Sequence, residues 1–517
     1  MNVLVSFFLV FILTKKSNAV PTPSSPPSSF RAAVYEHIPI MTTNKSEIKT
    51  RDEALEIMGL NLAVYKTQTE RAKQQGAQII VFPEDGIYGI HFTRTSISPY
   101  LEEIPNPETI QWSPCSEPNR FPNTEVQKNL SCLAQQNGVY LVANMGDRVP
   151  CKKLQDPKCP PDGRYQFNTD VAYGPDGMLL AKYHKTHLFY EDQFNTPEAK
   201  VVSFDTPFGR VGMLVCFDLL FKEPAVSMVI DHNITIIAFP TAWMDALPLL
   251  SAIGYHSSFA RGLGVNFLSA NIHLPVARFH GSGIFTPKGM SSFYYDNDPK
   301  SSGKLLVSTI DIVDPKKDAY NERIEGNGLS NRIKGDEFEA KIFNDIFTLR
   351  LLEDFSGEFK VCQNKVCCSL TFTFKDELLP PKDLFAFGVF DGQHTYQGQY
   401  YFQICTLIKC ANNTDRMSCG LPTKTSFGFF KDFTISGNFQ TSFIYPQVIF
   451  SDSDQLILGN LNSWSFHNDT IRASGPDLNR PLLSATLLGR DYTRDDMNMS
   501  LITSVEKKYP FYWILPM

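Results

Sequence analysis

The sequence is poor in charge and carries no basic run. Only 20% of its 517 residues are charged, and 48 Lys and Arg stand against 54 Asp and Glu, for a formal net charge of −6. Proteins that bind nucleic acid cluster positive charge on one face, because they must neutralise phosphates. We therefore expect no nucleic-acid partner for this chain.

Apolar segments long enough to cross a membrane are lacking after the N-terminus. A transmembrane helix needs about 20 consecutive apolar residues, and no segment after residue 19 approaches that length. The N-terminal segment is apolar from Val3 to Leu13 and reaches small residues at Ser17-Asn18-Ala19, which is typical of a secretory signal peptide. We expect residues 1–19 to be this signal peptide, and the mature protein to be secreted and extracellular.

The C-terminus is also short of apolar residues. Residues 509–517, which follow Lys507 and Lys508, are fewer than the roughly 10–20 apolar residues of a glycolipid-anchor signal. We therefore expect the protein to be released from the cell without such an anchor.

Cysteine is present, but one cysteine stands apart. Ten of the eleven fall in two groups, 115–159 and 362–419, where local disulfides form easily, whereas Cys216 is isolated. An odd number of cysteines in a secreted protein leaves at least one thiol unpaired. Asn-X-Ser/Thr sequons suit the same compartment, and the candidate glycosylation sites are Asn44, Asn129, Asn233, Asn412, Asn468 and Asn498.

The pattern of strands and helices changes near residue 315. Residues 30–314 alternate short apolar strand-like runs with helical ones, which is typical of an α/β domain. Residues 315–336 are polar and rich in Gly and Asn, which predicts a linker. Residues 337–517 hold strand-like runs and six cysteines, so we expect a second, smaller, β-rich domain with disulfides. The chain is also longer than a single hydrophobic core usually supports.

Two short patterns predict where helices begin. Thr50 and Glu53 form a Thr-x-x-Glu capping box, after which apolar residues recur at mostly helical spacing. Thr124 and Gln127 repeat the capping pattern before Leu130. We therefore expect a helix to start at each threonine.

Three reactive side chains follow apolar runs, at the positions where α/β sheets present their binding groups. Glu84 ends the run 77–84, Cys216 lies near the end of the run 210–218, and Lys185 follows a hairpin. Taken alone, each has a plainer interpretation, namely a helix cap, a buried core thiol and a surface charge. An unpaired thiol in an oxidising compartment is a liability unless it is buried or used, so the combination favours chemistry.

The three side chains supply complementary parts of an amide-cleaving reaction. A cysteine that attacks an amide needs a base that takes its proton and later protonates the leaving amine, and Glu84 suits both steps. The oxygen that becomes negative needs a positive partner, and Lys185 supplies it, with the backbone N–H after Cys216 as a further donor. The histidines are scattered and the cysteines suit disulfides better than ligands, so we expect no metal and no cofactor.

The residues around these three side chains resemble a known family. Phe82-Pro83-Glu84-Asp85, Tyr183-His184-Lys185 and Val215-Cys216-Phe217-Asp218 resemble, in that order, the Glu/Lys/Cys triad of the nitrilase (carbon–nitrogen hydrolase) superfamily. Further runs, such as Pro240-Thr241-Ala242-Trp243-Met244 and Phe390-Asp391-Gly392-Gln393-His394-Thr395, resemble its vertebrate branch of vanins (pantetheinases) and biotinidase. The resemblance extends over nearly the whole mature chain.

The resemblance implies a fold, a reaction and roles for the three residues. The expected fold is an α-β-β-α sandwich followed by the β-rich domain. Glu84 is then the proton acceptor, Lys185 the proton donor and oxyanion stabiliser, and Cys216 the nucleophile that forms a thioester. The expected substrate is a small-molecule amide, and runs such as Ile87-Tyr88-Gly89 favour pantetheine, which gives pantothenate and cysteamine. Biocytin, which gives biotin and lysine, is the alternative substrate.

Other interpretations stay open at this point. One is a catalytically inactive, secreted binding or adhesion member of the family. Another is a cysteine protease, for which His184 or His187 would be the partner of the thiol, although no local protease signature surrounds Cys216. Phe279-His280 stands where the resemblance leads us to expect Met-Thr, and we interpret His280 as a neutral packing residue.

Overall fold

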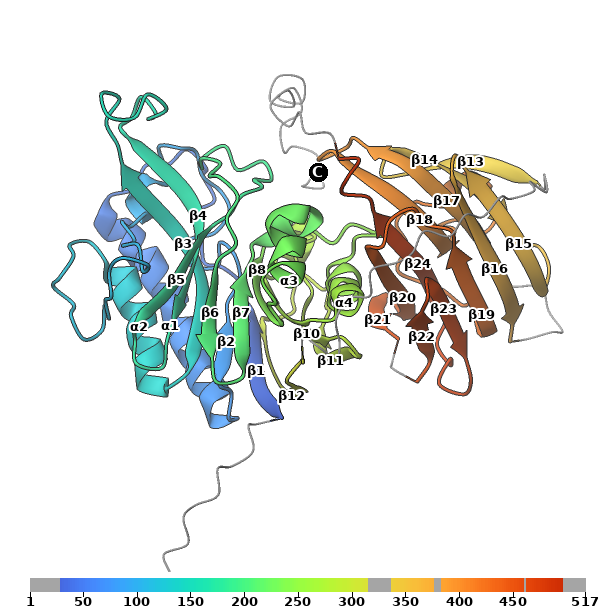
Figure 1. Cartoon of the computed structure of the whole chain (residues 1–517), viewed down its shortest axis with the longest axis horizontal. Coiled ribbons are helices and arrows are strands. Elements are labelled where there is room, and N and C mark those ends of the chain that lie inside the picture. The colour runs from blue at the N-terminus through green and yellow to red at the C-terminus, as the bar shows by residue number, and fades with distance from the viewer. Residues whose placement is uncertain (1–27, 315–335, 376–382, 460–461, 496–517) are drawn as a thin grey trace, which may run out of the picture.

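The computed structural model describes residues 28–314, 336–375, 383–459 and 462–495 (Figure 1). The expected signal peptide 1–19, nearly all of the expected linker 315–336 and the C-terminal residues 496–517 lie outside these ranges. Among the described residues, no helix has both the length and the apolar character needed to span a membrane.

Two six-stranded sheets pack on each other in the N-terminal part of the chain, which we call the N-terminal sandwich (Figure 1). In the first sheet the order is β12 (Lys304–Asp311), β1 (Ser29–Glu36), β2 (Ile79–Val81), β3 (Tyr140–Pro150), β4 (Arg164–Tyr173) and β5 (Leu179–His184). In the second the order is β11 (Gly289–Tyr294), β10 (Ser282–Thr286), β9 (Asn266–Asn271), β8 (Ile236–Thr241), β7 (Gly209–Met213) and β6 (Ser203–Thr206). Each sheet has three parallel strands at its centre, which places their carboxyl ends at one edge.

Helices cover the outer faces of both sheets. Helices α1 (Arg51–Gln74) and α2 (Glu125–Asn137) share a buried apolar cluster with the first sheet. The short α3 (Ser227–Ile230) and the longer α4 (Ala252–Leu263) pack in the cluster of the second. This arrangement is the α-β-β-α sandwich that the sequence predicted. The remaining short helical turns are η1 (Ser98–Tyr100), η2 (Cys216–Leu220), η3 (Lys222–Val226), η4 (Pro275–Ala277) and η5 (Arg416–Ser418).

One of the two predicted helix caps is correct. Thr50 Oγ1 accepts from the backbone N–H of Glu53, and the Glu53 carboxylate accepts from the backbone N–H of Thr50, so the capping box of α1 is complete. The helix start expected at Thr124 is correct, because α2 begins at the next residue, Glu125, but the Thr124 side chain accepts no capping bond. The buried carboxylate of Glu102 takes over instead and accepts from the backbone N–H groups of Val126 (2.8 Å) and Gln127 (3.1 Å).

A β-sandwich follows in the C-terminal part, which we call the C-terminal sandwich (Figure 1). Its larger sheet runs in the order β13 (Glu337–Ile342), β14 (Asp345–Leu351), β17 (Phe385–His394), β18 (Tyr400–Lys409), β24 (Leu482–Arg490), β20 (Ile444–Asp452) and β21 (Gln455–Leu458). The smaller sheet runs in the order β15 (Ser356–Gln363), β16 (Val366–Phe374), β19 (Phe430–Gly437), β23 (Thr470–Ser474) and β22 (Trp464–His467). The β-rich character expected of this region is therefore correct.

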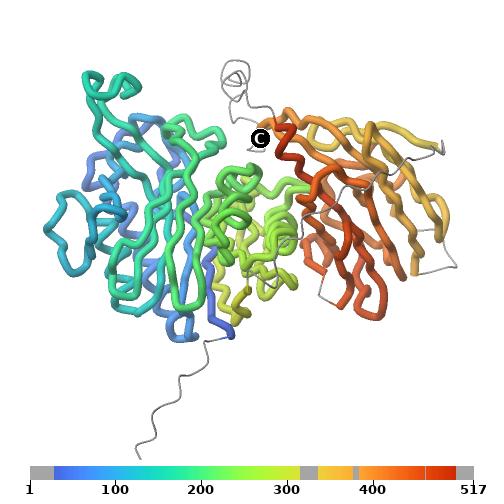
Figure 2. Tube along the Cα trace, viewed as in Figure 1, coloured from blue at the N-terminus to red at the C-terminus, as the bar shows by residue number. Residues whose placement is uncertain are grey.

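Helix α4 joins the two sandwiches, and the trace in Figure 2 shows it beside the strands of the C-terminal sandwich. Gly262 of this helix lies so close to β20 that an added Cβ would meet the carbonyl oxygen of Ile444 at 2.6 Å. The Gln447 amide donates to the carbonyl oxygen of Leu249 at 2.9 Å. The buried apolar cluster runs on from one sandwich into the other without a break.

All eleven cysteines lie within the described residues, and ten of them form five disulfides. Cys216 is the free one, as expected from its isolation in the sequence. Five disulfides in one chain are typical of proteins that mature in the secretory pathway. The pairs are Cys115–Cys132, Cys151–Cys159, Cys362–Cys367, Cys368–Cys405 and Cys410–Cys419.

Candidate active site

Glu84 lies just after the end of β2, where Phe82 and Pro83 carry the chain out of the sheet. It is only 1% exposed. One carboxylate oxygen accepts from the Asn168 amide at 2.8 Å, and the other accepts from the backbone N–H of Ala242 at 2.7 Å. These contacts fix the orientation of the carboxylate from both sheets.

Lys185 directly follows β5 and is 2% exposed. Its ammonium donates to Glu84 Oε1 at 2.7 Å and also to a carboxylate oxygen of Glu191. Burial alone would lower the pKa of Lys185, but the charges of Glu191 and Glu84 outweigh it and hold this pKa well above its ordinary value. The ammonium is therefore charged at every physiological pH, as an oxyanion partner must be.

Cys216 does not end a strand, contrary to the expectation of a strand over residues 210–218. Strand β7 ends at Met213, and Cys216 is the first residue of η2, a short 3₁₀ helix. Its φ is +45°, a conformation that costs a non-glycine residue about 1–3 kcal/mol and is concentrated at functional sites. Cys216 therefore lies on a turn beyond the end of the strand, where it is buried.

The three side chains form one electrostatic group. Burial raises the pKa of the Cys216 thiol well above its ordinary value; the charge of Glu84 raises it further, and Lys185 opposes the rise. The thiol is 6% exposed and stays neutral at rest. A neutral thiol needs a base before it can attack, because the thiolate is the nucleophile. Glu84 is the carboxylate whose charge acts most strongly on it.

Two further residues of this group escaped the sequence interpretation. Glu191 contacts the Lys185 ammonium, and it accepts from the Asn168 amide at 2.6 Å and from the Phe189 backbone N–H at 2.9 Å. Asn168 thus bridges Glu84 and Glu191 through one amide nitrogen. Nothing in the sequence distinguishes Glu191 from its neighbour Asp192. Asn168 did carry a signal, because the polar residues 166, 168 and 170 alternate along β4 and must share one face.

That polar face of β4 is fully buried between the sheets. Asn144 of β3 donates to Asn168 Oδ1 at 2.6 Å and to Asp170 Oδ1 at 2.9 Å, and its own oxygen accepts from the backbone N–H of Asp85. Burial raises the pKa of Asp170 and of Asp85 well above the ordinary value, with Glu84 adding to both shifts. Burial and the charge of Glu84 thus disfavour the charged form of both carboxyl groups.

The two histidines nearest to Lys185 are held by carboxylates. His184 Nε2 lies 2.8 Å from Asp147 Oδ2, and His187 Nδ1 lies 3.0 Å from Asp218 Oδ1. Each ring is thus paired with its own carboxylate, which does not favour a histidine as the partner of the Cys216 thiol in a cysteine protease.

His280 is a packing residue, as expected. It is 1% exposed and its ring lies edge-on to Tyr295, with a centroid separation of 4.6 Å. Burial lowers the pKa of His280 to about 3, and the charges of Lys424 and His273 act in the same direction. The ring is therefore neutral and packs against Tyr295.

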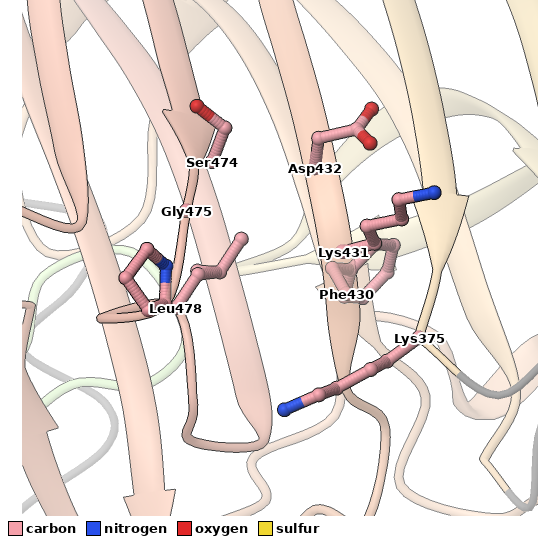
Figure 3. Close-up of a pocket in the computed structure, with 8 residues that line it drawn as sticks. Lys375, Phe430, Lys431, Asp432, Ser474, Gly475 and Leu478 are labelled. Atoms are coloured by element: carbon pink, nitrogen blue, oxygen red, sulfur yellow. The ribbon is translucent and has the colours of Figure 1, made fainter.

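A hollow on the C-terminal sandwich lies apart from these residues (Figure 3). It is bounded by Phe430 and Asp432 of β19 and by Leu478 beyond β23. It contains no thiol, so we place the candidate active site at Glu84, Lys185 and Cys216 instead. Within the described ranges, no three His, Cys, Asp or Glu side chains are grouped in a way that would hold a metal ion.

Five of the six candidate glycosylation sites are exposed. The side chains of Asn44, Asn129, Asn233, Asn412 and Asn468 lie at the surface, whereas Asn498 lies outside the described residues. Their modification stays a prediction.

Comparisons with known proteins assign the chain to a family. Residues 53–253 match the Carbon-nitrogen hydrolase family, and residues 336–495 match the Vanin C-terminal domain. A pantetheinase of Sus scrofa is 45% identical over 490 residues, which covers 94% of this chain and 92% of the relative. A biotinidase of Rattus norvegicus is 40% identical over 500 residues, which covers 90% and 93%. The crystal structure of an amidase from Nesterenkonia sp. is 19% identical with a TM-score of 0.38, and covers 56% of this chain and 94% of that one.

The buried, neutral His280 predicts how acid affects stability. Below pH 6.5 the unfolded chain takes up a proton at this residue and the folded chain does not, so the free energy of unfolding falls as the pH falls from 6.5 toward 3. Between pH 7.5 and 5.0 this loss is about 2 kcal/mol, at about 1.4 kcal/mol per pH unit. His280→Phe should remove it, as measured by denaturant unfolding at both values. His232→Phe at an exposed site is the control, and an equal acid loss in wild type and His280→Phe would contradict the assignment.

Proposed function

Because the chain belongs to the vanin and biotinidase branch of the carbon–nitrogen hydrolases, we propose that it hydrolyses the amide bond of pantetheine to pantothenate and cysteamine. Two observations support the proposal. The buried contact between Glu84 and Lys185, beside the free thiol of Cys216, supplies a base, a cation and a nucleophile. The identity of 45% to a pantetheinase, against 40% to a biotinidase, favours pantetheine over biocytin.

The first half of the reaction is acylation of Cys216. Glu84 takes the thiol proton as the sulfur attacks the amide carbonyl, and a tetrahedral intermediate forms. The Lys185 ammonium and the backbone N–H after Cys216 stabilise the oxygen that becomes negative. Glu84 then gives its proton to the leaving nitrogen, the carbon–nitrogen bond breaks, and cysteamine leaves a thioester on Cys216.

The second half releases the acid. Glu84 takes a proton from a water molecule as the water oxygen attacks the thioester carbonyl, and Lys185 again contacts the oxyanion. The carbon–sulfur bond breaks, the sulfur recovers the proton from Glu84, and pantothenate leaves. The sum is one amide and one water converted to one acid and one amine, without a cofactor.

Asn168 and Glu191 position the two groups that do this chemistry. Asn168 holds Glu84 in the orientation that also meets the Ala242 N–H, and Glu191 supplies a second negative partner for Lys185. With two carboxylates on one ammonium, Lys185 keeps a charged partner when Glu84 becomes protonated during catalysis. The ammonium is then free to turn one donor toward the substrate oxygen.

The reaction is assigned to one part of the chain. Residues 30–314 form the catalytic domain, residues 315–336 the linker and residues 337–517 the β-rich domain. The protein acts as a secreted, extracellular enzyme, which the five disulfides support. A purely adhesive member of the family has no need of a buried base and cation beside an unpaired thiol, so the site favours an active enzyme.

Substrate choice is tested by comparing pantetheine with biocytin on the purified full-length protein. We expect kcat/KM for pantetheine to exceed that for biocytin by ~10²-fold or more, because a site built for one polar arm rejects the other. Cys216→Ala measured with both substrates gives the background. A preference for biocytin would replace pantetheinase by biotinidase in the proposal, and no turnover of either would favour the inactive member.

Thioester formation is tested by mass spectrometry of a reaction quenched at steady state. We expect the pantothenoyl group on the peptide that contains Cys216, and we expect Cys216→Ala to be folded and inactive. Glu84→Gln keeps the shape of the side chain but cannot accept the thiol proton, so adduct formation should slow by ~10²–10⁴-fold. An adduct on a different residue, or turnover by Cys216→Ala, would overturn the assignment of the nucleophile.

The role of Lys185 is tested against a lysine of the same strand region. Lys182 also binds a buried carboxylate, Asp147 at 2.9 Å, but its contacts are with residues outside the triad. We expect Lys185→Gln to lower kcat by ~10²-fold or more, and Lys182→Gln to leave kcat near the wild-type value. Equal kcat in the two variants would show that Lys185 contributes only to structure.

A further inference from the structure

Arg490, the last residue of β24, reaches out of the C-terminal sandwich to the turn that carries Cys216. The residue is charged, yet its side chain is 0% exposed. Its Nε donates to the carbonyl oxygen of Leu220 at 3.1 Å, and its Nη2 donates to the same oxygen at 2.9 Å. Leu220 is the last residue of η2, the 3₁₀ helix that begins at Cys216.

The rest of the guanidinium is held by its own sandwich. Nη1 donates to the carbonyl oxygen of Tyr401 at 2.7 Å and to Asp495 Oδ1 at 3.0 Å, and Nη2 donates to Asp495 Oδ2 at 2.7 Å. A guanidinium has five N–H donors in a rigid fork. These three contacts and the two to Leu220 use all five. The Tyr492 ring lies 4.4 Å from the guanidinium carbon. Contacts within the C-terminal sandwich thus fix the position of the Arg490 side chain independently of its contact with Leu220.

The turn that begins at Cys216 needs support from outside itself. Cys216 has a strained φ of +45°, and η2 is only five residues long and lacks a side-chain cap at its N-terminus. Asp218 anchors the middle of the turn by accepting from Tyr183 at 2.7 Å and from the His187 backbone at 2.7 Å. Arg490 anchors its end, where carbonyl groups otherwise lack partners.

We propose that Arg490 is a positioning residue, which holds the nucleophile in its attacking geometry from the C-terminal sandwich. Arg490 acts through the backbone of Leu220 and touches neither the substrate nor the thiol. The inference rests on the proposed role of Cys216 as nucleophile. It gives the C-terminal sandwich a part in catalysis, because the catalytic turn is complete only when β24 is in place beside it.

The test compares two arginines that both cross between the sandwiches. Arg261 of α4 lies 3.9 Å over the Trp464 ring and donates to the Lys288 carbonyl oxygen, so it joins the same two bodies without contacting η2. In the full-length protein, Arg490→Lys keeps the charge but cannot form the fork. Arg261→Lys is the matched control.

For Arg490→Lys we expect kcat to fall by ~10–10²-fold, because small displacements of a reacting atom are costly. KM should change less than about threefold, since no substrate contact is lost. The rate at which iodoacetamide alkylates Cys216 should differ from the wild-type rate in Arg490→Lys and equal it in Arg261→Lys. Thermal unfolding measured on both variants separates these effects from a loss of stability.

A second variant keeps the test informative if Arg490→Lys is not secreted. Asp495→Asn removes the charge that fixes the guanidinium while Arg490 stays in place, and we expect a smaller fall in kcat, again at nearly constant KM. The comparison is made between Arg490→Lys and Arg261→Lys, with Asp495→Asn in place of Arg490→Lys if that variant is not secreted. The role of Arg490 is overturned if the two compared variants lose the same amount of thermal stability and have the same kcat. If instead alkylation of wild-type Cys216 leaves turnover intact, the proposed nucleophile is wrong.

Discussion

The ammonium of Lys185, buried between the carboxylates of Glu84 and Glu191, is the interaction on which the N-terminal sandwich depends. Moving such charges out of water costs several kcal/mol per ion, and this cost is offset only when charged and hydrogen-bonding partners are supplied. The polar face of β4 and the Ala242 N–H supply them, and they do so from both sheets. Asp85 and Asp170 lie in the same region, and burial raises the pKa of both, which disfavours further negative charge around one cation. The interior between two apolar sheets is therefore polar at the one place where chemistry is proposed.

The sequence was informative where local chemistry decides the structure. The alternating apolar runs predicted an α/β domain, the resemblance to the nitrilase superfamily predicted its α-β-β-α layers, and the Thr50 cap followed from its own four residues. The Thr124 cap failed because Glu102, a residue 22 positions away, satisfies the same backbone donors. Glu84 and Lys185 were singled out because both follow apolar runs, combine chemically with Cys216 and resemble the triad of a known family. Glu191 was not, since its role exists only after a loop folds back onto Lys185.

The same limit applies more strongly between the two sandwiches. Arg490 and Leu220 are separated by 270 positions, and no periodicity links them. What the sequence does hold is a set of small residues where the bodies meet, such as Gly262, whose missing Cβ lets α4 approach β20. The buried apolar cluster continues across this contact, and closely packed interiors of this kind transmit strain.

The raised pKa of the thiol reconciles a reactive cysteine with an oxidising compartment. Ten cysteines of this chain are oxidised to disulfides, and a thiolate exposed in the same surroundings would exchange with them. Burial raises the pKa of Cys216, and the nearby Glu84 charge raises it further, so the resting sulfur carries its proton and reacts slowly. In the proposed mechanism, the same Glu84 whose charge suppresses the thiolate at rest accepts the thiol proton when a substrate carbonyl is in place. In that mechanism protection and activation are properties of one carboxylate, and the thiolate forms only where an amide is present to consume it.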